Sequence, residues 1–219
     1  MDIGDRMKEN YEDRYRIKLT RRTPVIIRVD GKAFHTFTAG LDKPFDKDFM
    51  DDMVYAASQT SMEMQGFKMG YVQSDEASFL LTDYDDLDTD AWFDYSLSKL
   101  VSISAAYMTA FFNRWNLTFG IFDSRAFNVP MEEVANYFLW RARDWERNSL
   151  QMYCQANFSH KEMMNKNAAA QHEMLHSIGK NWAKDLTPRE KNGTFIFKGK
   201  IVDDFTPDFK TIEGFVDES

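Results

Sequence analysis

Three acidic residues stand where apolar runs of the sequence end. Asp30 follows the run 25–29, and Asp75 and Glu76 lie in a short polar turn between two further apolar runs. Two carboxylates about 5 Å apart repel each other by roughly 3 kcal/mol at an effective dielectric constant of about 20, and a cation, a raised pKa or water must relieve this cost. Oxygen ligands of this kind suit Mg²⁺, and two such ions can hold the attacking and leaving oxygens of a phosphoryl transfer. These residues favour a site of that class.

The residues after Asp30 suit a phosphate ligand. Gly31 lets a backbone approach closely, Lys32 supplies positive charge, and the backbone of "GKAFH" could wrap a triphosphate. The alternative is a plain turn, because Asp-Gly is among the commonest hairpin dipeptides. The second acidic turn at 73–76 leaves the two interpretations evenly balanced.

A βαββαβ order of elements would bring the acidic residues together. The pattern predicts a strand over 25–29, two strands within 68–84 and a strand over 122–129. It predicts helices within 44–67, 89–115 and 130–158, then shorter helices and a strand or hairpin at 193–200. This is the α+β, ferredoxin-like pattern, in which helices cover one face of an antiparallel sheet. Its first and third strands are neighbours, so Asp30 would meet Asp75 and Glu76.

Composition and charge restrict the function classes. The net charge is −8, yet 160–200 holds seven Lys and one Arg against three Glu and one Asp. The net charge argues against a general nucleic-acid binder, whereas the basic segment could bind phosphate locally or be a solvated helical surface. The single cysteine fits a reducing compartment, and the sequence shows neither a secretory signal nor an apolar run of about 18 residues. We therefore expect a cytoplasmic protein with no membrane partner.

The segment "HEMLH" at 172–176 matches the pattern of a zinc protease helix. A catalytic zinc site needs a third protein ligand, and no histidine follows His176. Short patterns of this kind also arise by chance, so we do not expect zinc here.

Several motifs occur together in one order. They are "RVDGKAFHTF" at 28–37, "KPFD" at 43–46, "GYVQSDEASF" at 70–79, "SLSKL" at 96–100, "FDSRAF" at 122–127 and "LWRARDWERNSL" at 139–150. Over 24–150 the chain resembles the tRNA-histidine guanylyltransferase superfamily. The segments 157–163 and 181–194 resemble its guanylyltransferase-like branch. The resemblance implies a polymerase-like palm over 1–159, with a helical, basic portion over 160–219 packed on it or joined with it in a single domain.

The resemblance also implies roles for individual residues. Two Mg²⁺ ions would bind Asp30, the Gly31 carbonyl and Asp75, and Glu76 would be an accessory catalytic carboxylate. A nucleotide would contact Asp30, Gly31, Lys32, Ala33, Phe34, His35, Lys43, Asp46, Ser74, Asp75 and Lys99. Phosphates or the tRNA end would contact Arg28, Arg125, Arg141, Asp144, Asn148 and Ser149, with Trp140 on the same helix. For that helix, ordinary packing and surface roles are the alternative.

One departure from the family bears on the substrate. The histidine-specific members carry His-Ile-Asn-Asn where this chain has "ERNS" at 146–149. The resemblance therefore implies template-dependent repair of a tRNA 5′ end, in the 3′-to-5′ direction, after ATP or GTP has activated the 5′-monophosphate. It also implies tRNA and nucleoside triphosphates as partners, and a homotetramer.

Three alternatives stay open: guanosine addition to tRNA-His, another palm-type enzyme such as a nucleotide cyclase, and an RNA-binding module without catalysis. The "KPFD", "SLSK" and "WRARD" segments favour the tRNA enzyme over a cyclase. The presence of both Asp30 and Asp75 argues against a module that only binds RNA.

Overall fold

A single antiparallel sheet lies at the centre of the fold. The computed structural model describes residues 1–116 and 119–219. Within them, the sheet order is β4-β1-β3-β2-β5-β6, with every neighbouring pair antiparallel. The strands are β1 (Val25–Gly31), β2 (Phe67–Gln73), β3 (Glu76–Leu81), β4 (Phe122–Asn128), β5 (Thr194–Phe197) and β6 (Lys200–Val202). The first and third strands are neighbours, so the predicted α+β class and this pairing are confirmed.

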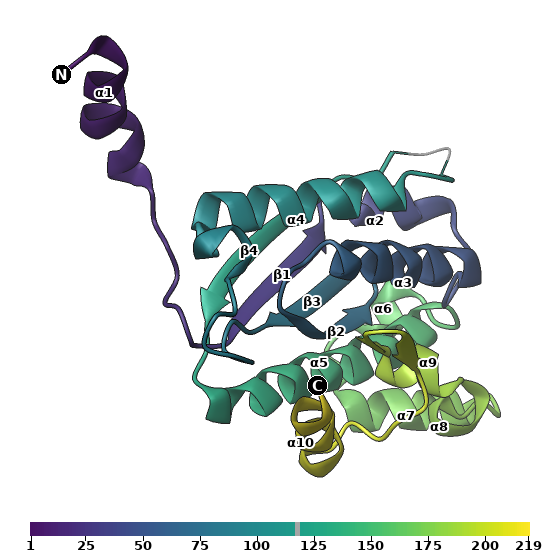
Figure 1. Ribbon diagram of the computed structural model, residues 1–219. Helices are drawn as coiled ribbons and strands as arrows, with labels where there is room; N and C mark the ends of the chain where they lie inside the picture. Colours follow the sequence, from purple (N-terminus) through teal and green to yellow (C-terminus); the bar gives the residue numbers. More distant parts are fainter. Residues whose placement is uncertain (117–118) are drawn as a thin grey trace.

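Helices cover both faces of the sheet, which corrects the prediction of helices on one face (Figure 1). The helices α3 (Lys47–Met62) and α4 (Leu97–Phe112) pack on one face, and α5 (Met131–Gln155) and α10 (Phe209–Glu218) on the other. The reason lies in β1, where Val25 and Ile27 enter the first core and Ile26 enters the second. A strand that is apolar on both faces needs cover on both faces.

Predicted boundaries agree closely with the observed helices. Asp46 caps α3 by accepting the backbone N–H of Phe49 at 2.9 Å, and Pro130 immediately precedes α5. The helix predicted within 89–115 is shorter, because the 3₁₀ turn η4 (Trp92–Tyr95) precedes α4. Phe93, Asp94 and Tyr95 all have positive φ there, which ends any continuous helix.

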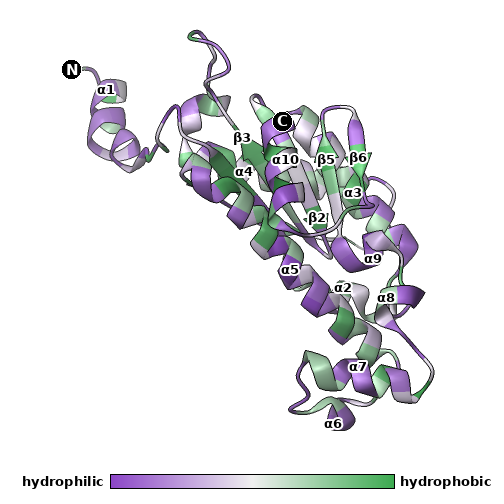
Figure 2. Cartoon of the chain, turned by 90° about the horizontal axis from the view of Figure 1, so that it is seen from below, coloured by the Kyte–Doolittle hydropathy of each residue, from purple (hydrophilic) through white to green (hydrophobic). Residues whose placement is uncertain are grey.

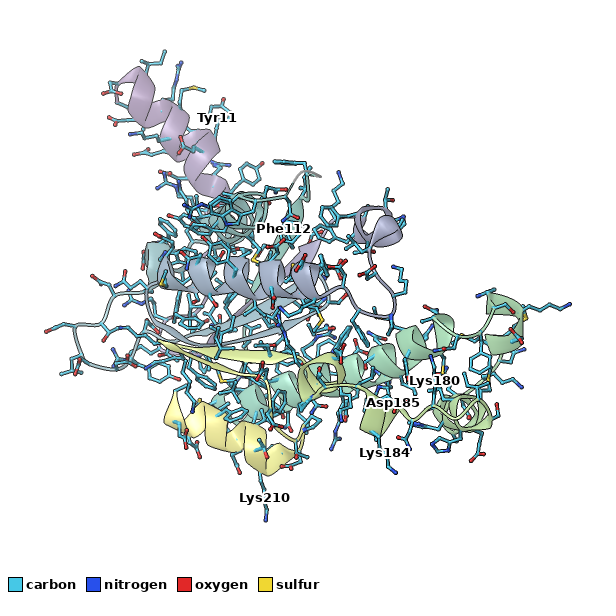
Figure 3. All side chains as sticks on the ribbon, turned by 90° about the vertical axis from the view of Figure 1, so that its right-hand side faces the viewer. Tyr11, Phe112, Lys180, Lys184, Asp185 and Lys210 are labelled. Carbon is cyan, nitrogen blue, oxygen red and sulfur yellow. The ribbon has the colours of Figure 1, made fainter. Side chains whose placement is uncertain are left out.

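A group of aromatic rings joins the end of β1 to the helices. The short helix α2 (Phe34–Phe37) and the 3₁₀ turn η3 (Thr38–Gly40) follow β1. The phenylalanine cluster consists of Phe34, Phe37, Phe49, Phe112 and Phe122, whose neighbouring ring centroids lie 4.9–6.1 Å apart. Phe112, labelled in Figure 3, lies in the interior of the molecule. The cluster anchors the loop that follows Asp30.

The C-terminal portion is not purely helical. Its helices are α6 (His160–Met163), α7 (Ala168–Ser177), α8 (Trp182–Asp185), α9 (Pro188–Asn192) and α10. Leu175 of α7 packs with Leu150 and Cys154 of α5 in a separate small core. The β5–β6 hairpin instead extends the sheet by pairing with β2. Figure 2 shows α6 and α7 beyond the sheet, at the end of α5. The division of the chain at residue 160 stays a prediction.

The N-terminal segment projects from the body of the molecule (Figure 1). It comprises α1 (Ile3–Met7), a π-helical turn (Lys8–Glu12) and a 3₁₀ turn (Asp13–Tyr15), with Tyr11 labelled in Figure 3. These turns were not predicted, because the segment has no buried residue that would give an apolar periodicity. Among the described residues, no helix combines the length and apolar character needed to cross a membrane.

Candidate active site

The end of β1 brings the predicted carboxylates together. Asp30 lies directly opposite Glu76 on β3, and the Gly31 N–H donates to the Asp75 carbonyl at 3.0 Å. The β2–β3 hairpin turns at Ser74, whose φ is +48°. Asp30, Ser74 and Asp75 line an open cleft of about 380 Å³ together with residues of α5. The strand pairing thus places both aspartates at one edge of one cleft.

The two aspartates are crowded. The pKa of Asp75 is raised to about 6, chiefly by burial and in part by the negative charges of Asp30 and Glu76, against hydrogen bonds from its own backbone and from Ser74 that lower it. Burial also raises the pKa of Asp30, with Asp123 acting in the same direction and Arg125 in the opposite one. A bound cation would relieve both effects, because it favours the ionised form of each carboxyl group.

These donors fit Mg²⁺. Asp30 and Asp75 offer carboxylate oxygens, and the neighbouring Gly31 carbonyl is a further oxygen ligand of the kind that Mg²⁺ accepts. Within 1–116 and 119–219, no group of three or more Asp, Glu, His or Cys side chains is arranged to hold a metal. The two aspartates would therefore share a Mg²⁺ ion with substrate phosphates and water, which is its usual mode of binding.

Glu76 and Arg141 form a buried ion pair beside the aspartates. The Glu76 side chain is buried, and Arg141 of α5 donates to both of its carboxylate oxygens, at 2.7 and 2.8 Å. The physical reason for the pair is that α5 covers this end of β3, and charged groups taken out of water must find a partner. Both residues also line the cleft, and the accessory catalytic role of Glu76 and the phosphate contact of Arg141 stay predictions.

The loop after Asp30 presents its backbone and two side chains. Lys32 and His35 are exposed, and Ala33 adopts the left-handed conformation, with φ +56°. Phe34 is buried in the phenylalanine cluster, so only its backbone could contact a nucleotide. A Cβ atom on Gly31 would lie 2.4 Å from the Phe34 ring. Gly31 is thus required for close packing as well as for approach to a ligand.

A smaller pocket of about 80 Å³ adjoins the cleft and shares Ser74 with it. Lys43 and Asp46 line this pocket, and their contact with a nucleotide stays a prediction. Both already have partners within the chain. The Lys43 ammonium donates to the Thr38 carbonyl at 2.9 Å, and Asp46 caps α3.

Arg125 and the carboxylate of Asp123 complete the β4 side of the site. Asp123 lies directly opposite Asp30, and Arg125 lies directly opposite Arg28. An Arg125 nitrogen is 3.1 Å from Asp123 and 3.8 Å from Asp30. Sequence reasoning missed Asp123. The alternation of the charged residues in "FDSR" on one face of a strand was the signal that could have found it.

Some of the residues predicted on α5 line the cleft, and others are paired or buried within the chain. Asn148 lines the cleft, whereas Asp144 pairs with Arg141 and Arg147. Ser149 is buried, and its hydroxyl accepts the Trp182 indole N–H at 2.9 Å, so its predicted phosphate contact stays a prediction. The predictions missed four other cleft residues of this helix. They are Trp145, Gln151, Met152 and Gln155. The polar residues at 148, 151 and 155 follow helical spacing, which was a usable signal.

Lys99 is not brought to the cleft. It is exposed in the first turn of α4, which packs on the face of the sheet opposite α5. Asp30 lies on the α5 face, because it alternates with Val29 of the other core. The continuous apolar residues at 25–27 were the signal that both faces of the sheet are covered.

Known proteins are similar to much of this chain. A family model described as tRNA(His) guanylyltransferase (Thg1) matches residues 4–130. The uncharacterized protein R259 of Acanthamoeba polyphaga mimivirus is 30% identical over 181 residues, covering 69% of this chain and 61% of that protein. The tRNA(His) guanylyltransferase of Schizosaccharomyces pombe is 33% identical over 144 residues, covering 61% and 53%. The chain thus spans between half and two thirds of the length of these relatives.

Two solved structures resemble almost the whole chain. A bacterial tRNA(His) guanylyltransferase (Thg1)-like protein in complex with ATP is 40% identical with a TM-score of 0.92, covering 98% of this chain and 99% of its own. The corresponding complex with GTP is 38% identical with a TM-score of 0.86, covering 98% of each chain. The enzyme from Saccharomyces cerevisiae shares the fold, with a TM-score of 0.77 at 20% identity over 92% of this chain and 95% of its own. The matched motifs, the fold and these similarities together show that the chain belongs to the tRNA(His) guanylyltransferase (Thg1) family.

Proposed function

We propose that this chain adds nucleotides in the 3′-to-5′ direction to the 5′ end of a tRNA, under the direction of the opposite strand of the acceptor stem. The observation that carries the proposal is the pair Asp30 and Asp75, held side by side at strand ends above an open cleft. Membership of the family supports it, and so do the ATP and GTP complexes of the similar bacterial protein.

The reaction needs positioning and charge rather than a protein nucleophile. In the activation step, the 5′-monophosphate of the RNA attacks the α-phosphorus of ATP or GTP and releases pyrophosphate. The 3′-hydroxyl of an incoming nucleotide then attacks the activated 5′-phosphorus and releases the nucleoside monophosphate. Each step is a substitution at phosphorus, for which cations and orientation suffice. Mg²⁺ held by Asp30 and Asp75 would neutralise charge on the reacting phosphates. Lys32 and Arg125 are exposed cations beside these aspartates.

The segment 146–149 supports repair over recognition of one tRNA. Glu146 is half-buried, and burial raises its pKa. Ser149 is held inside by Trp182, which leaves Asn148 to face the cleft. Ser149 thus serves packing, whereas Arg147 and Asn148 are exposed, and we propose that the chain does not read an anticodon through this segment. Guanosine addition to tRNA(His) is the second candidate, because the names of the relatives favour it.

The test uses two tRNAs that lack the first 5′ nucleotide and differ only in the anticodon. The base opposite the missing nucleotide is varied in each, and labelled nucleotides are supplied with ATP and Mg²⁺. We expect the added nucleotide to follow the templating base and to ignore the anticodon, with Asp30→Asn as the inactive control. A tenfold preference for the tRNA(His) anticodon, about 1.4 kcal/mol in the transition state, would refute the repair proposal if guanosine is added whatever the template.

A further inference from the structure

One tryptophan beside the site is partly exposed to solvent. Trp140 lies on α5, and about half of its surface faces solvent at 51% exposure. Its ring is flanked by two guanidinium groups, with the central carbon of Arg141 at 4.5 Å and that of Arg28 at 6.0 Å from the ring centroid. Tyr137 contacts it edge-on, at 5.9 Å between centroids. The ring is therefore held in place while one part of it remains open.

The arginines around this ring are not fully paired within the described residues. Arg28 and Arg125 lie directly opposite each other on β1 and β4, and like charges in that arrangement are destabilising. The buried Nε atom of Arg28 has no hydrogen-bond partner among the described residues. Its nearest carboxylate is Glu76, at 3.8 Å, and both oxygens of Glu76 already accept hydrogen bonds from Arg141. Arg125 already contacts Asp123 and Asp30, at 3.1 and 3.8 Å, so the hydrogen-bonding capacity that the fold leaves unused is that of Arg28.

This surface lies on one side of the aspartates, and the small pocket lies on the other. Arg28 precedes Asp30 by two residues on the same face of β1, a distance of about 7 Å along a strand. Arg125 belongs to β4, the outer neighbour of β1. The pocket of Lys43 and Asp46 instead adjoins the Ser74 turn, beyond β3. The site therefore has two flanks, an exposed surface at Trp140 and a pocket of about 80 Å³ at Lys43.

We propose that Trp140 stacks on the base of the 5′-terminal nucleotide of the RNA, while Arg28 and Arg125 bind a phosphate next to that nucleotide. The proposal rests on the proposed function, because it assumes an RNA 5′ end at Asp30 and Asp75. Stacking on an aromatic ring tolerates every base, since each base has a π-face. Such a contact would hold any tRNA end and leave selection to the template. The flank that contains Lys43 then takes the incoming nucleotide.

The first experiment measures RNA affinity by fluorescence anisotropy without added nucleotide, together with addition kinetics. We expect Trp140→Ala to weaken the binding of a 5′-truncated tRNA by roughly tenfold or more, and to raise the KM for RNA but not for ATP. Trp140→Phe should retain most of the affinity, because it keeps an aromatic face. The matched control is Trp115→Ala. Trp115 is 69% exposed and also lies under an arginine, Arg114, at 4.8 Å. We expect no change in that variant.

The second experiment separates stacking from a structural role. The same variants bind an RNA whose 5′-terminal nucleotide lacks its base. If Trp140 stacks on that base, the wild type should lose affinity for the abasic RNA, and Trp140→Ala should lose little more. An equal loss in Trp140→Ala on both RNAs would overturn the proposal, and so would unchanged affinity on the intact RNA. A change of sedimentation coefficient in Trp140→Ala without a base-dependent loss would show that the ring contacts another protein chain instead.

The two proposals can fail separately. Base-dependent binding through Trp140, in a wild-type protein that adds no nucleotide, would refute the proposed reaction and leave the stacking surface in place. Normal templated addition with unchanged RNA binding in Trp140→Ala would refute the stacking surface and leave the proposed reaction in place.

Discussion

Asp75→Asn should stabilise the metal-free protein while abolishing nucleotide addition. The pKa of Asp75 in the folded protein is about 6, against its usual value of 3.8. A gap of about two pKa units corresponds to roughly 3 kcal/mol of unfavourable free energy when the carboxyl group is ionised. This is an upper bound, because the cleft is open to water. Asparagine has nearly the same size and carries no charge, so most of this cost should disappear.

The direction of the Asp75 pKa shift determines the pH range in which the stability of the two proteins differs. The folded-state pKa of Asp75 is raised, so its favourable contribution is fully present below pH 3.8 and is lost as the pH rises through about 6. The difference in unfolding free energy between Asp75→Asn and the wild type should therefore be near zero at pH 4 and reach its full size above pH 6. Urea unfolding in EDTA, repeated from pH 4 to pH 8, measures this difference.

Magnesium and a neighbouring carboxylate provide the controls. Mg²⁺ should stabilise the wild type, because it binds the folded state, and should stabilise Asp75→Asn much less. Asp123→Asn removes an exposed carboxylate that also faces Asp30, and we expect its stability to change by less than about 0.5 kcal/mol. Equal stability of Asp75→Asn and the wild type at pH 8, or equal stabilisation of both by Mg²⁺, would refute the assignment of Asp75 as a crowded metal ligand.

Three further predictions concern the surroundings of the site. Glu76→Gln or Arg141→Met alone should destabilise the protein by about 3 kcal/mol, and the double variant by less, as measured by a double-mutant cycle in urea. Additive losses would show that the buried pair is not coupled. Gly31→Ala should lower both stability and nucleotide addition, because its methyl group would press on the phenylalanine cluster; an unchanged melting temperature would contradict this. The double variant His172→Ala, His176→Ala should retain full activity, and one zinc per wild-type chain by elemental analysis would reverse that expectation.

Local patterns of the sequence were sufficient for the core of the fold. The apolar run ending at Asp30 and the polar turn at Asp75 predicted two strands, and the order of elements predicted that they pair. The same information could not say which helix covers which face, because a continuous apolar run in a strand requires only that both faces are covered. The resemblance assigned Lys99 and Ser149 to the site, whereas the structure places Lys99 on α4, over the other face, and Ser149 in a buried hydrogen bond with Trp182. The hairpin β5–β6 was visible as a pattern, but its partner strand was not.

The sequence also could not show which carboxylates form ion pairs. Glu76 follows Asp75 directly, so a reading along the chain groups the two as equivalent ligands. Alternation along the strand separates them, since Glu76 points under α5 and meets Arg141. Asp123 was overlooked for the converse reason, because it is far from Asp30 in the chain and becomes its neighbour only through the β1–β4 pairing.

The strand order has a consequence for the synthesis of the chain. β2 ends at Gln73, but its second neighbour, β5, begins only at Thr194. At about 5–20 residues per second, the ribosome needs on the order of 10 s to make the intervening segment. During this time one edge of β2 has open N–H and C=O groups, and such an edge can pair with other chains. We expect nascent chains stalled before β5 to depend on chaperones far more than chains stalled after β6.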